Sequence, residues 1–346
     1  MAAFRASASE LERSGLSGSV ARSIASGCTF DDAIDQQERA RASGVEIIPV
    51  TDPRYPPQLG QIFDPPLLLF ARGRTELLGS IMLGIVGTRR PTPYGVAATE
   101  RLAADLAHAG LTIVSGMARG IDTAAHKSTL DAGGNTVAVF GCGLDNVYPA
   151  ENRNLAAALA EKGLLISEFP MGAPAYPQNF PVRNRIISGV SVGILVVEGA
   201  QYSGSAITAR MATEQEREVF AVPGSIMSKM SWGPNLLIKQ GAKLVQEWND
   251  VIVELPAEVR RRLISAGQQR LLPDLAPADA DAATAELSKA SRELLNRLQP
   301  DGATHLDQLL ETLEPWSSSE IIAALFELEM LGLVRQLPGR NYIRVW

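Results

Sequence analysis

The chain has 346 residues, of which 46% are hydrophobic and 20% are charged, so its composition is that of a folded globular protein with room for two or three domains. Its two cysteines, Cys28 and Cys142, lie far apart without a CxxC partner, which excludes a disulfide framework and a cysteine-rich zinc site and favours a reducing compartment. The net charge of −6 is unusual for a nucleic-acid-binding protein, but it is uneven, because residues 81–250 carry 14 Lys and Arg against 14 Asp and Glu, whereas residues 286–346 carry 6 against 9.

The N-terminal part predicts a small helical region followed by an extended segment. Residues 1–48 contain two short helical patterns, and the opening MAAFRASASELERSG has no apolar stretch of the kind found in secretory signals. The Pro-rich segment IIPVTDPRYPPQLGQIFDPPLLLFARG then predicts an extended lead-in that packs on the main domain. The strongest apolar run of the chain, 192–197, is too short to cross a bilayer. We therefore expect a cytoplasmic protein with no membrane partner.

Within a main domain expected at residues 49–255, the chain from Ile81 onward repeats one unit, in which a short apolar run is followed by a turn of small residues and a helical pattern. The apolar runs lie at 81–87, 111–116, 136–143, 164–168, 192–199 and 219–224, with a weaker seventh at 243–247. Continuous Val, Ile and Leu runs are typical of strands buried on both faces, and their alternation with helices indicates crossover connections. The sequence therefore predicts an α/β fold with a doubly wound parallel sheet.

The turns after these strands are candidate binding elements, because ligands of such sheets bind beyond the carboxyl ends of the strands. They hold Gly87, Thr88 and Arg89 after the first run, Ser115 and Gly116 after the second, and Ser203, Gly204 and Ser205 before a helix. Small residues let backbone N–H groups and helix N-termini approach an anion, and the Arg89 guanidinium can hold a phosphate. Two alternatives stay open, a pair of surface arginines at 89–90 and an ordinary serine cap at Ser203.

No motif for a cofactor, a metal or a catalytic nucleophile is recognised. The first turn reads GIVGTR instead of GxGxxG, and the second strand ends in Ser115-Gly116 instead of an acidic residue, so the dinucleotide fingerprint is not met. The P-loop pattern is absent as well, and HExxH, GxSxG and SxxK do not occur at a useful place. Asp122 and His126 are spaced i,i+4 and could share a metal or act as an acid/base pair; alternatively Asp122 caps its helix and His126 packs among alanines. We expect no cofactor, no metal and no catalytic residue.

The segment EFPMGAPAYPQNFPVRNRIISGVS combines an aromatic residue with cations. Phe180 lies in a Pro-rich stretch beside Arg183, Asn184 and Arg185, so a loop here offers a stacking face next to phosphate-binding groups. Single-stranded nucleic acid requires this combination, and several anion-ready turns together indicate a polyanion instead of one small phosphate. The alternative is a loop anchored by a buried Phe180, with its arginines in ion pairs.

The C-terminal part predicts a linker and a second small domain. Residues 256–285 include the stretch LLPDLAPADADAATAE, whose Ala, Pro and Asp content is typical of a flexible linker. Residues 286–346 show helical runs near 287–298, 304–312 and 317–331 and a hairpin that turns at Pro338-Gly339, which together predict a winged helix. The third helix carries Glu320, Glu327 and Glu329 and no Lys or Arg, so phosphates would repel it and a protein partner is favoured.

Together these motifs resemble the DNA processing protein A (DprA/Smf) family. The matching pieces follow the family's order over residues 50–250, namely IVGTRRPTPYG, SGMARGIDTAAH, VFGCGLDNVYPAEN, SEFPMG, NFPVRNRIISGVS, VVEGAQYSGSAITA and VFAVPGS with GPNLLIKQGA. The resemblance implies an extended Rossmann-like domain that binds single-stranded DNA without marked sequence preference, flanked by an N-terminal sterile-alpha-motif-like helical domain and a C-terminal winged helix. It also implies a homodimer that helps to load the RecA recombinase onto incoming DNA during natural transformation.

The same resemblance implies roles for individual residues. Gly87, Thr88 and Arg89 match the family's phosphate-contacting turn, Phe180 with residues 183–185 matches its pocket loop, and residues 203–205 match a further turn at the same end of the sheet. The chain departs from the family at one point. Some relatives have a lysine shortly before the aromatic residue, where this chain reads Pro-Gln-Asn, which puts that lysine contact in question.

Two rival functions come from other classes. Nucleoside-monophosphate phosphoribohydrolases of the lysine-decarboxylase-like type share this kind of sheet and carry a PGGxGTxxE pattern at a strand end. The corresponding segment of this chain, EGAQYSGSAITA, has no Glu at that spacing. The release of free base from AMP would reveal this activity. A scaffold that binds recombinase and no DNA is the second rival, and it would leave the anisotropy of a labelled oligonucleotide unchanged.

Overall fold

The computed structural model describes residues 6–27, 30–201, 203–270, 289–298, 304–312, 316–330, 334–337 and 341–344. The chain divides into two compact units, Met1–Leu271 and Leu272–Trp346. None of the helices within the described ranges is long and apolar enough to cross a membrane.

The first unit begins with three short helices, where the sequence predicts two helical patterns. They are α1 (Ala8–Arg13), α2 (Gly18–Ala25) and α3 (Phe30–Ala42). Ser7 begins α1 with a capping box, since its hydroxyl accepts the Glu10 N–H while the Glu10 carboxylate accepts the Ser7 N–H. The end of α3 contacts the sheet, because Ala40 is buried and the Gln36 side chain donates to the Met171 carbonyl over 3.2 Å.

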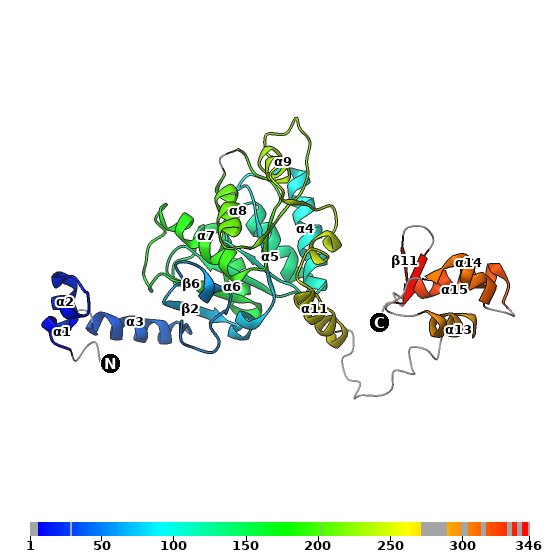
Figure 1. The fold of residues 1–346 in the computed structure, drawn as a ribbon. Helices are drawn as coiled ribbons and strands as arrows, with labels where there is room; N and C mark the ends of the chain where they lie inside the picture. The colour runs from blue at the N-terminus through cyan, green and yellow to red at the C-terminus, as the bar shows by residue number, and fades with distance from the viewer. Residues whose placement is uncertain are drawn as a thin grey trace. The chain divides into compact units, whose positions relative to one another are not determined.

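A nine-stranded sheet forms the centre of the first unit (Figure 1). Its strands are β1 (Glu46–Pro49), β2 (Leu68–Gly73), β3 (Met82–Val86), β4 (Thr112–Ser115), β5 (Thr136–Phe140), β6 (Leu164–Ser167), β7 (Gly193–Val196), β8 (Glu218–Ala221) and β9 (Lys243–Leu244). They lie in the order β1-β2-β6-β5-β4-β3-β7-β8-β9. The seven strands β3 to β9 are parallel and coincide with the seven apolar runs, so the predicted doubly wound sheet is confirmed.

The Pro-rich lead-in packs on the sheet as predicted, but it is not simply extended. It contributes β1 and β2, an antiparallel pair that joins the sheet where β2 pairs with β6. Between them, Tyr55, Leu59 and Ile62 are buried in the core, and the Tyr55 hydroxyl donates to the Pro66 carbonyl over 2.8 Å. The prolines of this segment favour turns, and these turns direct the apolar side chains into the core. The sequence pattern alone does not distinguish such turns from an extended segment.

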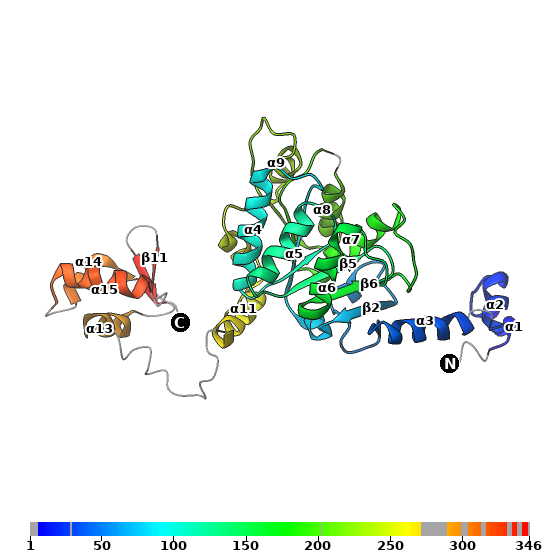
Figure 2. The ribbon, with the colours of Figure 1, turned by 180° about the vertical axis from the view of Figure 1, so that it is seen from behind.

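Helices cover both faces of the sheet (Figure 2). They are α4 (Pro93–His108), α5 (Ile121–Asp131), α6 (Arg153–Lys162), α7 (Asn179–Val190), α8 (Gly204–Glu214), α9 (Trp232–Lys239), α10 (Trp248–Ile252) and α11 (Ala257–Arg270). Met82 and Val86 of β3 pack with apolar residues of α7 and α8, whereas Leu83 and Ile85 pack with α4 and α5. This alternation along one strand produces two cores, one on each side of the sheet.

Helix α7 corrects the expectation of a loop around Phe180. The helix begins at Asn179, so Phe180 is its second residue and Pro181 its third. Proline is tolerated in the first turn of a helix, where its missing N–H has no intrahelical partner to lose. The Pro-rich composition that predicted a loop is therefore compatible with a helix start.

Helix α11 differs from the expected linker. The first half of residues 256–285 forms α11, and Leu263 is buried in the same core as Val251 and Leu255. The second half of the expected linker lies outside the described residues. The residues of α11, which precede the Ala-, Pro- and Asp-rich stretch, therefore belong to the first unit.

The second unit combines helices with a small antiparallel sheet, as predicted for its sequence. Its elements are α13 (Lys289–Arg297), β10 (Thr304–His305), α14 (Leu306–Thr312), α15 (Ser318–Met330), β11 (Val334–Leu337) and β12 (Asn341–Arg344). The sheet has the order β10-β12-β11, and Leu294, Leu325 and Leu328 are buried in a core of its own. The expected turn at 338–339 lies outside the described residues.

The position of Leu263 leads to a stability prediction. In a chain truncated after Arg270, whose only tryptophans are Trp232 and Trp248, Leu263→Ala should lower the free energy of unfolding by about 2–5 kcal/mol, because it leaves a cavity in a packed core. Urea denaturation followed by tryptophan fluorescence measures this value. The matched control is Val253→Ala, which removes a side chain that is 47% exposed and should change the free energy by less than about 0.5 kcal/mol. Equal effects of the two changes would mean that α11 does not pack on this core.

Candidate nucleic-acid interface

The order of the strands places a binding site at the carboxyl ends of β3 and β7. The chain passes from β3 to β4 on one side and returns to β7 on the other side of β3. The connecting helices therefore leave β3 and β7 on opposite faces of the sheet, and a crevice opens between the turns that follow the two strands. These turns hold residues 87–92 and 197–203.

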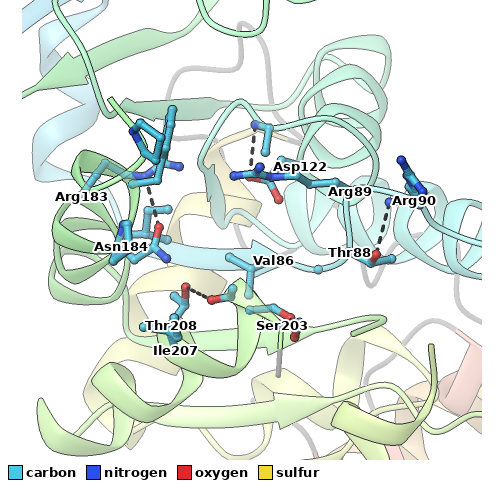
Figure 3. A pocket seen from close by; sticks show the side chains of 18 of the residues that line it. Val86, Thr88, Arg89, Arg90, Asp122, Arg183, Asn184, Ser203, Ile207 and Thr208 are labelled. Carbon is cyan, nitrogen blue, oxygen red and sulfur yellow. Dashed lines mark hydrogen bonds between the residues drawn. The ribbon is translucent and has the colours of Figure 1, made fainter. Parts of the chain in front are cut away.

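A cavity of about 700 Å³ occupies this crevice. Figure 3 shows Arg183 and Asn184 of α7 on one side of it and Thr88 and Arg90 on the other, with Val86 between them. Of the residues that the sequence predicts for the site, this cavity is lined by Gly87, Thr88, Arg89, Phe180, Arg183, Asn184, Ser203, Gly204 and Ser205. Ser115, Gly116 and Arg185 do not line it.

The turn after β3 is held rigidly while its arginines remain exposed. The Thr88 N–H donates to the Glu198 carbonyl over 2.7 Å, and the Thr88 carbonyl accepts the Ile121 N–H over 3.2 Å. A Cβ at Gly87 would lie 2.5 Å from the Ile121 side chain, so only glycine permits this approach of the turn to α5. Arg89 and Arg90 are exposed, and neither takes part in a salt bridge among the described residues. Both guanidinium groups are thus available to an anion.

Arg183 is a buried cation beneath the cavity. Its side chain donates to the carbonyl oxygens of Gly116, over 2.7 Å, and Val139. Its Nε donates to the Asn184 side-chain oxygen over 3.2 Å. Burial lowers the pKa of Arg183 to about 10, so the group is still a cation at neutral pH. Arg183 therefore adds positive potential to the cavity from below, with two of its nitrogens already bonded to protein oxygens.

The position of the Arg183 guanidinium requires glycine at residue 116. A Cβ at this position would lie 2.6 Å from the Arg183 guanidinium, so the end of β4 can accept the buried arginine only without a side chain. Ser115 beside it is fully buried and donates to the Ile85 carbonyl over 2.6 Å, so its hydroxyl is used inside the sheet. Gly116 lines a second, adjoining cavity of about 50 Å³. These two predicted residues support the site from behind.

Asp122 and His126 are both buried near Arg183. The Asp122 carboxylate accepts the N–H groups of Gly116 over 3.0 Å and Ala118 over 3.3 Å, so it fixes the loop before its helix instead of capping the helix itself. Burial raises the pKa of Asp122, against the effect of the Arg183 charge. His126 bonds to the Thr136 hydroxyl over 2.7 Å, and burial followed by the Arg183 charge lowers its pKa to about 3, so it is neutral at physiological pH. No group of three or more potential ligands for a metal ion occurs in the described ranges.

Arg185 is directed away from the cavity. It forms two hydrogen bonds with the Glu168 carboxylate, of 3.0 and 2.7 Å, and its side chain is only 15% exposed. It also lies 3.4 Å from Asp64. The alternative in which the arginines form ion pairs is therefore correct for Arg185. Of residues 183–185, Asn184 is the one that lines the cavity with a side-chain amide still able to bond to a ligand.

Two aromatic rings lie together on the cavity wall. The ring centroids of Phe180 and Tyr148 are 5.3 Å apart. The guanidinium carbons of Arg89 and Arg183 lie 5.7 and 5.9 Å from the Phe180 centroid, within the range of cation–π attraction. Phe180 is half-buried, but Tyr148 is 47% exposed. The sequence prediction does not include Tyr148, although its motif VFGCGLDNVYPAEN is among the pieces that match the family; the aromatic residue followed by proline is the signal that could have found it.

The N-terminus of α8 forms the third part of the wall. Ser203 precedes the helix, but its side chain does not cap it, since the Ser203 hydroxyl bonds instead to the Ser205 hydroxyl over 2.7 Å. Gly204 is exposed, and a Cβ there would meet nothing within 4 Å. The ordinary serine cap is therefore not formed, and the first turn of an 11-residue helix opens onto the cavity, with the positive end of its dipole toward it.

Comparisons with known proteins show the family of this chain. Residues 46–256 match the model of the family described as DNA recombination-mediator protein A, and residues 278–340 match that of the DprA winged helix domain. The chain is 45% identical to DNA processing protein DprA of Bacillus subtilis over 217 residues, which are 62% of this chain and 73% of that protein. It is 41% identical to Protein Smf of Escherichia coli over 303 residues, which are 86% of this chain and 77% of that protein.

Solved structures give the same result for the fold. DNA processing protein A from Streptococcus pneumoniae aligns with a TM-score of 0.66 and 38% identity, over 72% of this chain and 86% of that chain. DNA processing protein A from Helicobacter pylori, in a structure that describes its single-stranded DNA binding mode, aligns with a TM-score of 0.54 and 31% identity, over 61% of this chain and 93% of that chain. With the family model matched across the whole nine-stranded sheet and relatives this similar, the chain belongs to the DNA recombination-mediator protein A (DprA/Smf) family.

Proposed function

We propose that this chain binds single-stranded DNA in the cavity at the ends of β3 and β7 and acts as a recombination mediator. The observation that carries the proposal is that the unpaired Arg89 and Arg90 and the exposed ring of Tyr148 line one cavity. A single strand presents phosphates and unpaired bases together, and binding it takes cations beside an aromatic face. Duplex DNA keeps its bases stacked and would leave the aromatic face unused.

The phosphate side of the site consists of the turn after β3 and the start of α8. Arg89 and Arg90 supply exposed charge, and Arg183 adds a positive potential from beneath. The open N-terminus of α8 at Gly204 supplies backbone N–H groups. We assign phosphate contacts to Arg89, to residues 87–88 and to residues 203–205, and a supporting role to Arg183, Ser115 and Gly116.

The base side of the site is assigned to Tyr148 with Phe180 behind it. Tyr148 is the more exposed of the two rings, and Phe180 holds it in place from α7. Every base has a π-face, so stacking on Tyr148 does not discriminate between sequences. The Asn184 side-chain amide borders the same space and can bond to a base edge or a phosphate.

The hydrolase alternative is less well supported by this geometry. Among the described residues that line the cavity, Asp122 is the only one with a carboxylate, and this group is bonded to backbone N–H groups. Glu198, at the end of the β7 run, is buried and accepts bonds from the Thr92 N–H and hydroxyl over 2.8 and 2.6 Å. A ribose-attacking carboxylate would have to reach the cavity, so we favour binding without catalysis.

Membership of the family supports a wider role. We propose a homodimer in the cytoplasm that helps to load the RecA recombinase onto single-stranded DNA. We further propose residues 1–48 as an N-terminal helical region, 49–255 as the DNA-binding domain and 286–346 as the winged-helix domain, the last with a protein partner. The net excess of acidic residues in that last segment favours protein over DNA.

The first prediction for the site concerns the kind of DNA. The full chain should bind a labelled single strand more tightly than a duplex of the same length, and affinity should fall steeply with salt because phosphate contacts release counterions. Fluorescence anisotropy in a salt series measures both effects. Equal affinity for duplex, or an affinity independent of salt, would contradict the proposed function.

A second prediction concerns Arg89. Arg89→Ala should weaken single-strand binding and reduce the log–log salt slope by about 0.7–1, as expected for the loss of one phosphate contact. Arg210→Ala is the matched control, since Arg210 is an exposed arginine of α8 that pairs with Glu214 and does not line the cavity. If both variants keep the slope of the original chain, Arg89 is only a surface charge.

A third prediction concerns the two rings. Tyr148→Ala should cost about 1–3 kcal/mol of binding with an unchanged salt slope, whereas Tyr148→Phe should bind normally. Phe180→Ala should weaken binding and also lower Tm, because Phe180 is half-buried. Tyr176→Ala is the control, as Tyr176 is 52% exposed and does not line the cavity. Normal binding by Tyr148→Ala would remove Tyr148 from the site.

A further inference from the structure

The loop between β8 and α9 exposes two large apolar side chains. Ile226 is 92% exposed and Met227 is 87% exposed, and of the large apolar residues in the described ranges only Phe63 is more exposed. Exposed apolar side chains that stand singly need no explanation, but two adjacent ones on a projecting tip indicate a binding surface. The loop projects beside α9 in Figures 1 and 2.

The tip is built by its own hydrogen bonds. The Met227 N–H donates to the Ser225 hydroxyl over 3.2 Å, and the Ser228 N–H donates to the Ser225 carbonyl over 3.0 Å. The Met230 N–H donates to the Ser228 hydroxyl over 3.3 Å. Serines therefore form a turn that holds Ile226 and Met227 outward, which lowers the entropy lost when these side chains bind something.

The loop is attached to the wall of the DNA cavity. The Gly199 N–H donates to the Met230 carbonyl over 2.7 Å, and the Gly233 N–H donates to the Gly199 carbonyl over 2.8 Å. Met230 itself lines the cavity, and Gly199 belongs to the turn that leads to Ser203. At its other end, the Pro223 carbonyl accepts the Tyr94 hydroxyl over 2.7 Å. The exposed tip is thus continuous with the proposed single-strand site.

The charge around the tip favours an anionic partner. Residues 219–246 include three lysines and no Asp or Glu. Lys229 lies next to the tip and is exposed, and no salt bridge in the described part of the chain involves Lys229 or Lys239. A partner that is anionic and also presents apolar faces is an unpaired nucleic acid strand, whose phosphates suit Lys229 and whose bases suit Ile226 and Met227.

We propose that Ile226 and Met227 form a wedge that inserts between neighbouring bases of the strand as it leaves the cavity. In proteins that bind the minor groove of duplex DNA, apolar side chains of this kind, Ile and Met among them, enter base steps and unstack them. The wedge separates one base from its neighbours and so allows that base to lie against Tyr148. The inference rests on the proposed function and adds to it a second contact with bases outside the cavity.

The test uses the full chain and single-stranded oligonucleotides that carry one 2-aminopurine at successive positions. This base brightens when it is unstacked, so binding of the original chain should raise the fluorescence at one or two adjacent positions. The double variant Ile226→Ser with Met227→Ser should lose at least half of that rise and bind about three- to tenfold more weakly, because an unstacking contact is removed. The salt slope should stay the same, since no cation is lost.

The matched control is Phe63→Ser, which removes a still more exposed apolar side chain that does not line the cavity. It should keep both the affinity and the fluorescence rise. The wedge is overturned if the double variant binds and brightens as the original chain does. A changed sedimentation coefficient of the double variant would overturn it in favour of a contact between copies of the chain, and loss of binding to anionic vesicles alone would do so in favour of a lipid surface.

The outcome is separable from that of the proposed function. If the original chain does not bind single strands at all, the proposed function fails and the wedge fails with it. If the original chain binds, loses affinity in Arg89→Ala and shows no dependence on residues 226–227, only the wedge fails.

Discussion

The buried guanidinium of Arg183 holds together the parts of the molecule on which the cavity depends. It belongs to α7, yet it binds carbonyl oxygens at the ends of β4, through Gly116, and β5, through Val139. Its charge lies close to Asp122, which in turn fixes the loop between β4 and α5. Taking a cation out of water is costly, and here the cost is offset by these oxygens. The arrangement requires glycine at position 116 and places α7 at the mouth of the sheet.

The polar groups of the site therefore fall into two sets: those bonded within the protein, which hold the site in place, and those left free to contact a ligand. The buried polar side chains behind the cavity, those of Ser115, Asp122 and His126, form hydrogen bonds within the protein and support the site. The groups that remain free lie further out, on the turn after β3, at the start of α8 and on the Tyr148 ring. A site with fixed support and free cations on its rim loses little order on binding, which favours affinity for an extended polyanion.

The two kinds of contact have different consequences for recognition. The phosphate contacts proposed for Arg89 and Arg90 would depend on salt and carry no sequence information. Stacking on an aromatic ring is tolerant of sequence for another reason, because all four bases offer a similar face. A chain with a net charge of −6 can therefore bind DNA through a local concentration of cations in a region that is neutral as a whole.

The sequence by itself determined the seven parallel strands, the family and most of the cavity-lining turns, because continuous apolar runs and the small residues after them are local signals. It did not determine which way each side chain points. The sequence pattern presents residues 183–185 as one cationic group beside Phe180, but on helix α7 residues two apart differ in direction by about 200°, so Arg183 and Arg185 diverge. Arg183 is then buried against strand ends and Arg185 pairs with Glu168, a residue far away in the sequence. Tyr148 became a candidate only through its exposure beside Phe180, since burial depends on contacts between distant segments that no local pattern records.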